Sequence, residues 1–332
     1  MQSNDLRADS GAWWTKKIAF RVKLAGLAGM LTYIAYHLHQ QPTSVSTVWQ
    51  QLGAGTGSPG WLTGLVLLMP VNWGIEARKW QLLIRRIEPI SFGEAYQGVL
   101  AGVSLGFTLP VLAGDAAGRV LSLRTSRRAG AVGASLVSGG LQFLAALLTG
   151  TVAWAYHLLT IPSRNTFTAW VLLITFSLVL LLSMLTAGLR HRLIGRANPE
   201  RFPWLRNVLP YWQTAGEYTN QELSTAFGLA LLRHLTFSAQ FYLALRLYGI
   251  DLAAGPMISG IGVVFLAKTV TPAFTFLSDL GVREAAALWV FSPYGVSAPL
   301  LLTATFTLWL TNVLAPVLVG LLAVWRLRLT TR

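Results

Sequence analysis

The most informative segment of the chain is Thr108-Leu109-Pro110-Val111-Leu112-Ala113-Gly114-Asp115-Ala116-Ala117-Gly118-Arg119, where an apolar run stops at a proline and an arginine follows an aspartate by four residues. The same order returns in Thr271-Pro272-Ala273-Phe274-Thr275-Phe276-Leu277-Ser278-Asp279-Leu280-Gly281-Val282-Arg283-Glu284. Pro110 and Pro272 are 162 residues apart, which is close to half of the 332 residues. A period near half the chain length predicts an internal duplication.

The register of the two copies continues upstream of each proline. Gly98 precedes the first proline by 12 residues, and Gly260 precedes the second by 12 residues. We therefore expect two repeat halves, at about residues 60–160 and 223–325.

The composition indicates an integral membrane protein. Apolar residues make up 54% of the chain and charged residues only 11%, with a mean hydropathy of +0.54, whereas soluble domains carry about 25% charged residues. No long polar stretch separates the apolar segments, so residues 1–332 are predicted to form a single transmembrane domain. The absence of cysteine excludes disulfides and thiolate metal sites.

The net charge of +14 comes from basic residues that lie mainly between the apolar segments. This placement is typical of cytoplasmic loops that contact anionic lipids, and we expect no nucleic-acid partner. The predicted protein is therefore a multi-pass protein of the cytoplasmic (inner) membrane with both termini in the cytoplasm. The N-terminal segment contains no convincing cleavage site, so its apolar run is interpreted as an uncleaved span.

The hydropathy pattern predicts an all-α fold with about six full transmembrane helices. They cover about residues 18–37, 60–80, 132–159, 167–189, 223–245 and 298–324. Two further apolar pieces, 95–113 and 253–271, are rich in glycine and closed by the two prolines. All basic segments fall on one side only if both pieces fold back as re-entrant hairpins. The hairpins then enter from opposite faces, which makes the duplication an inverted repeat, as in many transporters.

The two hairpins predict a site for an anion. A helix that restarts after a proline has unpaired N–H groups and a positive dipole end, which together favour negative ligands. Arg119 and Arg283 lie about one turn further on, and a guanidinium can hold two phosphate oxygens. Asp115 and Asp279 are placed to hold these arginines. The structural alternative is that each aspartate is an N-cap with a helical ion pair to its arginine.

Four further charged residues in or beside apolar segments complete the predicted substrate-binding set: Glu76, Arg233, Lys268 and Glu284. Charged groups at membrane depth are costly and usually functional, although interfacial snorkelling and local charge balance are structural alternatives. The uncharged polar residues Asn72, Gln142 and Asn312 are interpreted as hydrogen-bonding between helices.

Several apparent motifs carry no chemistry. Residues 102–106 read Gly-Val-Ser-Leu-Gly, but the hydrolase motif of this form needs a strand-turn-helix setting. His37 and His39 are isolated at a span end, so no metal site is expected. No phosphate-binding Walker loop is present. We expect no cofactor, and no catalytic motif is convincing.

Three segments resemble a known family: Asn72-Trp73 through Arg78-Lys79-Trp80, then Pro110 with Gly114-Asp115 and Arg119, and then Leu280-Gly281-Val282-Arg283-Glu284-Ala285. They are similar to the flippase-like transmembrane domain of lysylphosphatidylglycerol synthases, over about residues 12–328. The resemblance implies movement of a phospholipid or related lipid between leaflets, with Asp115, Arg119, Arg283 and Glu284 at its site. It differs from the family pattern at Ser278-Asp279 and at residues 309–311, where the family often has glycines and an arginine, respectively. The sequence contains only the membrane part, so we expect no synthase activity from it alone.

Three functions remain open from the sequence. The leading hypothesis is a flippase-like translocase of an anionic or aminoacylated lipid with a phosphate headgroup. The second is a membrane-embedded lipid-phosphate enzyme that uses Asp115 or Asp279 as a base. The third is a non-transporting partner of a lipid-synthesis enzyme.

Overall fold

The computed structural model describes residues 59–108, 111–161, 166–196, 200, 205–271 and 276–330. These residues contain helices and no strand, which confirms the all-α class. The helices are α3 (Pro59–Ile84), α4 (Phe92–Thr108), α5 (Val111–Leu121), α6 (Arg128–Thr160), α7 (Phe167–Gly195), α8 (Leu205–Glu217), α9 (Asn220–Leu247), α10 (Ala254–Val270), α11 (Phe276–Phe291), α12 (Ala298–Trp309) and α13 (Ala315–Thr330). A 3-10 turn spans Ser292–Tyr294 and a π turn spans Leu310–Leu314. The span predicted at 18–37 lies outside the described residues.

Within the described residues, three helical segments are long and apolar enough to cross a membrane: Arg128–Thr160, Phe167–Gly195 and Ala298–Leu322. The second of these, α7, buries only Ala169 and Arg190 against the rest of the protein. Such an apolar helix with an exposed surface suits contact with lipid chains. The 17-residue α10 is equally apolar but shorter than a full span.

At each of the two prolines, one helix ends before the proline and another begins after it, as predicted. Helix α4 ends at Thr108 and α5 begins at Val111, on either side of the first proline. Helix α10 ends at Val270 and α11 begins at Phe276, on either side of the second. Proline removes a backbone donor and disfavours the helical conformation of the preceding residue, so a helix ends there.

Two helices lie outside the predicted spans. Helix α8 lies between α7 and α9 and is anchored to α6, because Thr214 Oγ1 donates to Gly130 O at 3.3 Å. Helix α11 has 16 residues and begins after the second proline. A hydropathy window selects long apolar segments, so it does not detect short helices that carry polar residues.

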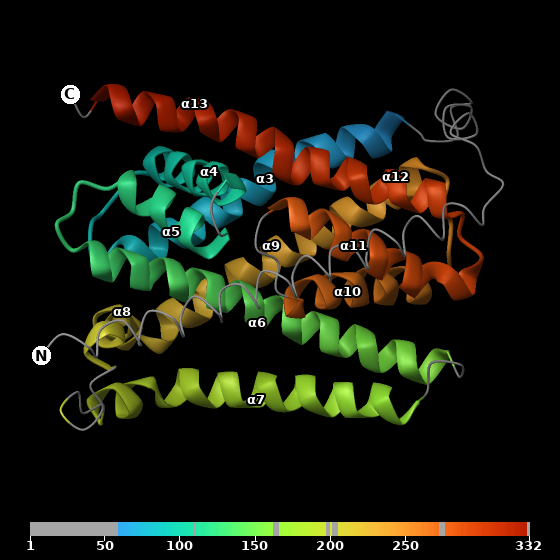
Figure 1. Ribbon diagram of the computed structural model, residues 1–332, viewed down its shortest axis with the longest axis horizontal. Helices are drawn as coiled ribbons and strands as arrows, with labels where there is room; N and C mark the ends of the chain where they lie inside the picture. The colour runs from blue at the N-terminus through green and yellow to red at the C-terminus, as the bar shows by residue number, and fades with distance from the viewer. Residues whose placement is uncertain are drawn as a thin grey trace, which may run out of the picture.

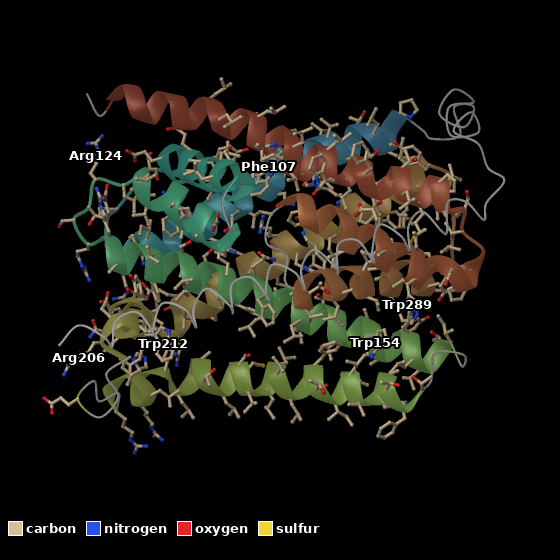
Figure 2. All side chains as sticks on the ribbon, in the orientation of Figure 1. Phe107, Arg124, Trp154, Arg206, Trp212 and Trp289 are labelled. Atoms are coloured by element: carbon tan, nitrogen blue, oxygen red, sulfur yellow. The ribbon has the colours of Figure 1, made fainter. Side chains whose placement is uncertain are left out.

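The two helix pairs lie toward opposite ends of the long axis (Figure 1), with α4 and α5 at the left and α10 and α11 at the right. Helices α3 and α9 pack against each other between them. Helix α4 packs on α13, and α10 packs on α6. Figure 2 shows Arg124 and Arg206 at the left end and Phe107, near the end of α4, toward the middle of the molecule.

Candidate functional site

A cavity of about 310 Å³ lies where the two helix pairs, α3, α6 and α9 meet. Both helix pairs contribute charged residues to its wall: Asp115 and Arg119 come from α5, Lys268 from α10 and Arg283 from α11. Arg119 and Arg283, which are 164 residues apart in the sequence, therefore line one cavity.

Glu76 of α3 is the centre of the ionic network in this cavity. Its Oε1 accepts a hydrogen bond from Arg119 Nη2 at 3.0 Å, and its Oε2 lies 2.8 Å from Lys79 Nζ and 3.4 Å from Arg233 Nη1. Ser138 Oγ also donates to Oε1, at 3.1 Å. One buried carboxylate thus faces three cations from three helices, which offsets part of the cost of removing those charges from water.

Arg119 is held by a second carboxylate and by an aromatic ring. Its Nε donates to both oxygens of Asp115 at 3.0 Å. Its guanidinium lies over the Trp80 ring, 5.3 Å from the centroid. The predicted four-residue Asp-Arg pair therefore exists, but it is part of a network that also includes Glu76. The Asp115 side chain is 27% exposed and Arg119 is 6% exposed, so Asp115 lies at the mouth of the cavity.

Arg233, in the middle of α9, enters the same network from the opposite wall. Its Nε donates to Asn72 Oδ1 at 3.0 Å and its Nη1 to Gln142 Oε1 at 3.3 Å. The guanidinium stacks over Trp73, 5.0 Å from the ring centroid, a distance typical of cation–π contacts. Its five donors and planar shape explain why arginine rather than lysine suits this position.

The uncharged residues Asn72 and Gln142 join helices, as predicted. Asn72 Nδ2 donates to Gln240 Oε1 at 3.1 Å, and Gln142 Nε2 donates to Ala230 O at 3.3 Å. Asn312 is different. It is 1% exposed, and neither amide atom has a hydrogen-bond partner among the described residues.

The second helix pair supplies Arg283 and Lys268 to the cavity wall. Arg283 is 2% exposed, and its Nε and Nη2 donate to Glu284 Oε1 at 3.3 and 3.2 Å. Glu284 is buried but is not part of the wall. The Asp279 side chain lies outside the described residues.

Cationic side chains gather around two carboxylates on the cavity wall. Lys79, Arg119 and Arg233 form ion pairs with Glu76, and Arg119 also pairs with Asp115. Lys268 and Arg283 line the same wall, and Arg283 pairs with Glu284. A cluster of ammonium and guanidinium groups on one cavity wall can bind an anion.

Sequence reasoning missed several wall residues. Lys79 follows Glu76 by three residues, a helical ion-pair spacing that was visible in the sequence. Trp73 and His234 left no comparable signal, because aromatic residues at span ends and single histidines are common in structural roles. His234 contacts Thr149 Oγ1 through Nε2 at 2.8 Å.

The sequence model of the family described as lysylphosphatidylglycerol synthase TM region matches residues 20–320, which include every residue of the cavity wall. A comparison with curated proteins gives no match. The match confirms the resemblance noted in the sequence, and the family description associates the chain with membrane lipids. Together with its apolar helices, the match makes this chain a multi-pass membrane protein that belongs to the family of the lysylphosphatidylglycerol synthase transmembrane region.

Proposed function

We propose that the protein moves an anionic phospholipid between the two leaflets and that the headgroup binds in the cavity. The observation that carries this proposal is the network on the cavity wall in which Lys79, Arg119 and Arg233 surround the buried Glu76. A phosphodiester supplies a negative charge and several acceptor oxygens for these cations. Charge-assisted bonds from arginine to phosphate are among the strongest in proteins.

The proposed architecture is six full spans and two re-entrant hairpins, arranged as an inverted repeat. Its support is a set of matched contacts. A Cβ at Gly150 of α6 would lie 2.6 Å from Leu266 of α10, and a Cβ at Gly320 of α13 would lie 2.2 Å from Leu100 O of α4. The last helix of each half therefore packs closely on the first hairpin helix of the other half, as a twofold relation requires.

Helices α3 and α9 are two further spans in this architecture, in addition to the three apolar helical segments and the span predicted at 18–37. They have 26 and 28 residues, long enough at 1.5 Å per residue to cross a bilayer. Their charged residues Glu76, Lys79 and Arg233 lower their hydropathy, yet these side chains turn toward the cavity rather than toward lipid. Ionisable residues within spans usually have this placement.

The orientation follows from the positive charge. Arg124 and Arg206 lie at the same end of the molecule as the C-terminal end of α13 (Figures 1 and 2). Since basic residues are retained in the cytoplasm, we propose that this end lies on the cytoplasmic side of the cytoplasmic membrane, and an even number of spans then puts the N-terminus on the same side. Anionic lipids are the expected contacts of these arginines.

In the proposed mechanism the phosphate competes with the carboxylates for the arginines. Asp115 lies at the mouth and is the most exposed charged member of the Glu76 network. A headgroup that enters there meets Arg119 first, and then Arg233 and Arg283 on the opposite walls. Without lipid, the carboxylates pair with the arginines. As the phosphate binds, it replaces the carboxylates as the partner of the arginines, so their positive charge remains compensated throughout.

The test is leaflet exchange in vesicles that contain the purified protein. Fluorescent phosphatidylglycerol in the inner leaflet becomes accessible to an external reductant only after it has crossed. We expect Arg119→Gln and Arg283→Gln to lower the exchange rate about tenfold or more, because each removes a charged hydrogen-bond donor. Arg119→Lys, which keeps the charge without the planar fork, should retain intermediate activity.

The matched control is Arg127→Gln. Arg127 is 56% exposed and pairs with Glu217 outside the cavity, so its loss should leave exchange unchanged. Equal rates in all variants, with folding verified by thermal unfolding, reject the transport role. The enzyme alternative requires product formation by the purified protein alone; both oxygens of Asp115 already accept from Arg119, which weakens that aspartate as a base. The partner alternative requires that lipid synthesis survive these same substitutions.

A further inference from the structure

Asn312 lies at a helical irregularity beside the cavity. It is the middle residue of the π turn Leu310–Leu314, which interrupts the last apolar segment between α12 and α13, and its side chain is part of the cavity wall. A π turn is rare, shifts the following side chains around the helix and often occurs at functional sites. Here the turn contributes two residues, Asn312 and Val313, to the cavity wall, and it lies just before Pro316, whose ring and missing N–H disturb a helix.

The Asn312 amide is closed off from bulk solvent and has no protein partner among the described residues. Buried amides without hydrogen bonds are rare because each unpaired group costs free energy. Asn72 provides the contrast within the same protein, since its Nδ2 and Oδ1 both have partners. The Asn312 side chain therefore has the capacity to bind a ligand group that fits this wall.

Other polar atoms of the wall without a hydrogen-bond partner identify what that group must supply. Among the described residues these are Arg119 Nη1 and Trp73 Nε1, whereas Glu76 Oε2 makes no hydrogen bond but is held in ion pairs with two cations. Arg119 Nη1, Trp73 Nε1 and Asn312 Nδ2 are donors, whereas Asn312 Oδ1 is an acceptor. A bare phosphate satisfies donors only and leaves the acceptor unpaired. A hydroxyl group next to the phosphate both donates and accepts, so it can satisfy the complete set.

We propose that Asn312 is a specificity-determining residue that binds a hydroxyl group of the headgroup beside the phosphate. This inference rests on the proposed function, because it assigns one part of the headgroup site in the same cavity. The favoured ligand is a phosphodiester lipid whose headgroup alcohol keeps a free hydroxyl. Phosphate binding itself depends on the arginines, and Asn312 adds the preference among anionic lipids of equal charge.

The test measures equilibrium binding by the full chain in phosphatidylcholine nanodiscs. The two probes are short-chain phosphatidylglycerol and phosphatidylpropanol, which have the same charge and the same three-carbon headgroup but differ in two hydroxyl groups. The wild-type protein should bind phosphatidylglycerol about tenfold more tightly, the value of one or two hydrogen bonds in a buried site. Asn312→Leu should bind both lipids with the affinity that the wild type has for phosphatidylpropanol.

Stability separates this role from a structural one. Leucine has a similar shape and no unpaired polar atoms, so Asn312→Leu should leave the unfolding temperature unchanged or raise it, whereas Asn72→Leu should lower it. A loss of stability with equal weakening of both lipids would assign Asn312 a structural role and overturn the proposal.

The possible failures can be told apart. If the wild type binds both probes without preference, or if Asn312→Leu keeps the preference, the assignment of Asn312 is wrong and the anion site stands. If the wild type binds neither probe, the headgroup site itself is wrong and the proposed function fails with it. If the preference depends on Asn312 but no lipid crosses the membrane, the binding role stands and the transport role fails.

Discussion

The two helix pairs share one sequence pattern but are packed in different ways. In the α4–α5 pair the backbones touch: a Cβ at Gly118 would lie 2.3 Å from Gly102 N, and one at Gly114 would lie 2.5 Å from Gly106 N. In the α10–α11 pair a Cβ at Gly260 would meet the Phe291 ring at 2.7 Å. The first pair is therefore fixed by backbone contact, and the second by a side chain.

The ion pairs of the two arginines in this pattern, Arg119 and Arg283, also differ. Arg119 is bound by a carboxylate of its own helix and by Glu76 from α3. Within the described residues, Arg283 pairs with Glu284, its neighbour in the chain. A repeated sequence thus brings two cations to one cavity, but the described surroundings of the two differ. The α4–α5 pair is the more closely packed of the two pairs, so substitutions there should have the larger effects.

The largest effect is expected from replacing Glu76. Glu76→Gln leaves Lys79, Arg119 and Arg233 facing one another with one carboxylate fewer, and breaking a buried ionic network in this way costs about 3–5 kcal/mol. Glu284→Gln disrupts the pair with Arg283 and should cost less, about 1–3 kcal/mol. Unfolding of the detergent-solubilised variants measures both losses.

Added lipid provides the control for this first prediction. An anionic lipid that replaces the missing charge should stabilise Glu76→Gln more than it stabilises the wild type, because it binds only the folded protein. Neutral phosphatidylcholine should have no such effect. Equal losses for the two glutamine variants would remove the proposed difference between the halves.

A smaller effect on stability is expected from adding a methyl group at the glycines where two helices touch. In Gly118→Ala the new methyl group meets backbone atoms of α4 that cannot move alone, and such overpacking costs about 1–3 kcal/mol. Gly260→Ala meets the end of the Phe291 ring, which can shift, so its cost should be lower. Gly188→Ala on α7 is the control, since no atom lies within 4 Å of its added Cβ. A larger loss for Gly260→Ala than for Gly118→Ala would contradict the comparison.

The features that sequence reasoning predicted are those with a local signal. Prolines end helices through their own covalent geometry, so the breaks after Thr108 and Val270 were predictable. The repeat then indicated that Arg119 and Arg283 lie near each other, because charged groups at membrane depth avoid lipid.

The remaining features depend on contacts between distant residues. Glu76 meets Arg119 across 43 positions of the chain, and no short-range pattern marks it as the centre of the network. The π turn at Asn312 lies just before Pro316, whose ring and missing N–H disturb a helix, but no local pattern indicates that the Asn312 amide lacks a hydrogen-bond partner among the described residues. The interpretation of Asn312 as an interhelical bridge was therefore wrong, while the same interpretation of Asn72 was confirmed.

The smallest effect concerns the contact that joins the two halves. Asn72 of α3 and Gln240 of α9 are 168 residues apart, close to the repeat period, and they hydrogen-bond to each other. In the proposed inverted repeat, α3 and α9 are the corresponding helices of the two halves, and they pack against each other. Asn72→Leu and Gln240→Leu should each lower the stability by about 1 kcal/mol or slightly more, because each leaves the other amide buried and unpaired.

The double variant tests whether the hydrogen bond between Asn72 and Gln240 itself stabilises the packing of α3 on α9. Replacing both amides removes both polar groups, so the combined loss should be smaller than the sum of the single losses, with a coupling of about 1 kcal/mol. Unfolding of the four proteins under one condition gives this coupling directly. Strictly additive losses would mean that the two amides act through Arg233 and Leu65 O, their other partners, and not through each other. The halves would then be held together by the ionic network and by the close packing of α6 on α10 and of α13 on α4.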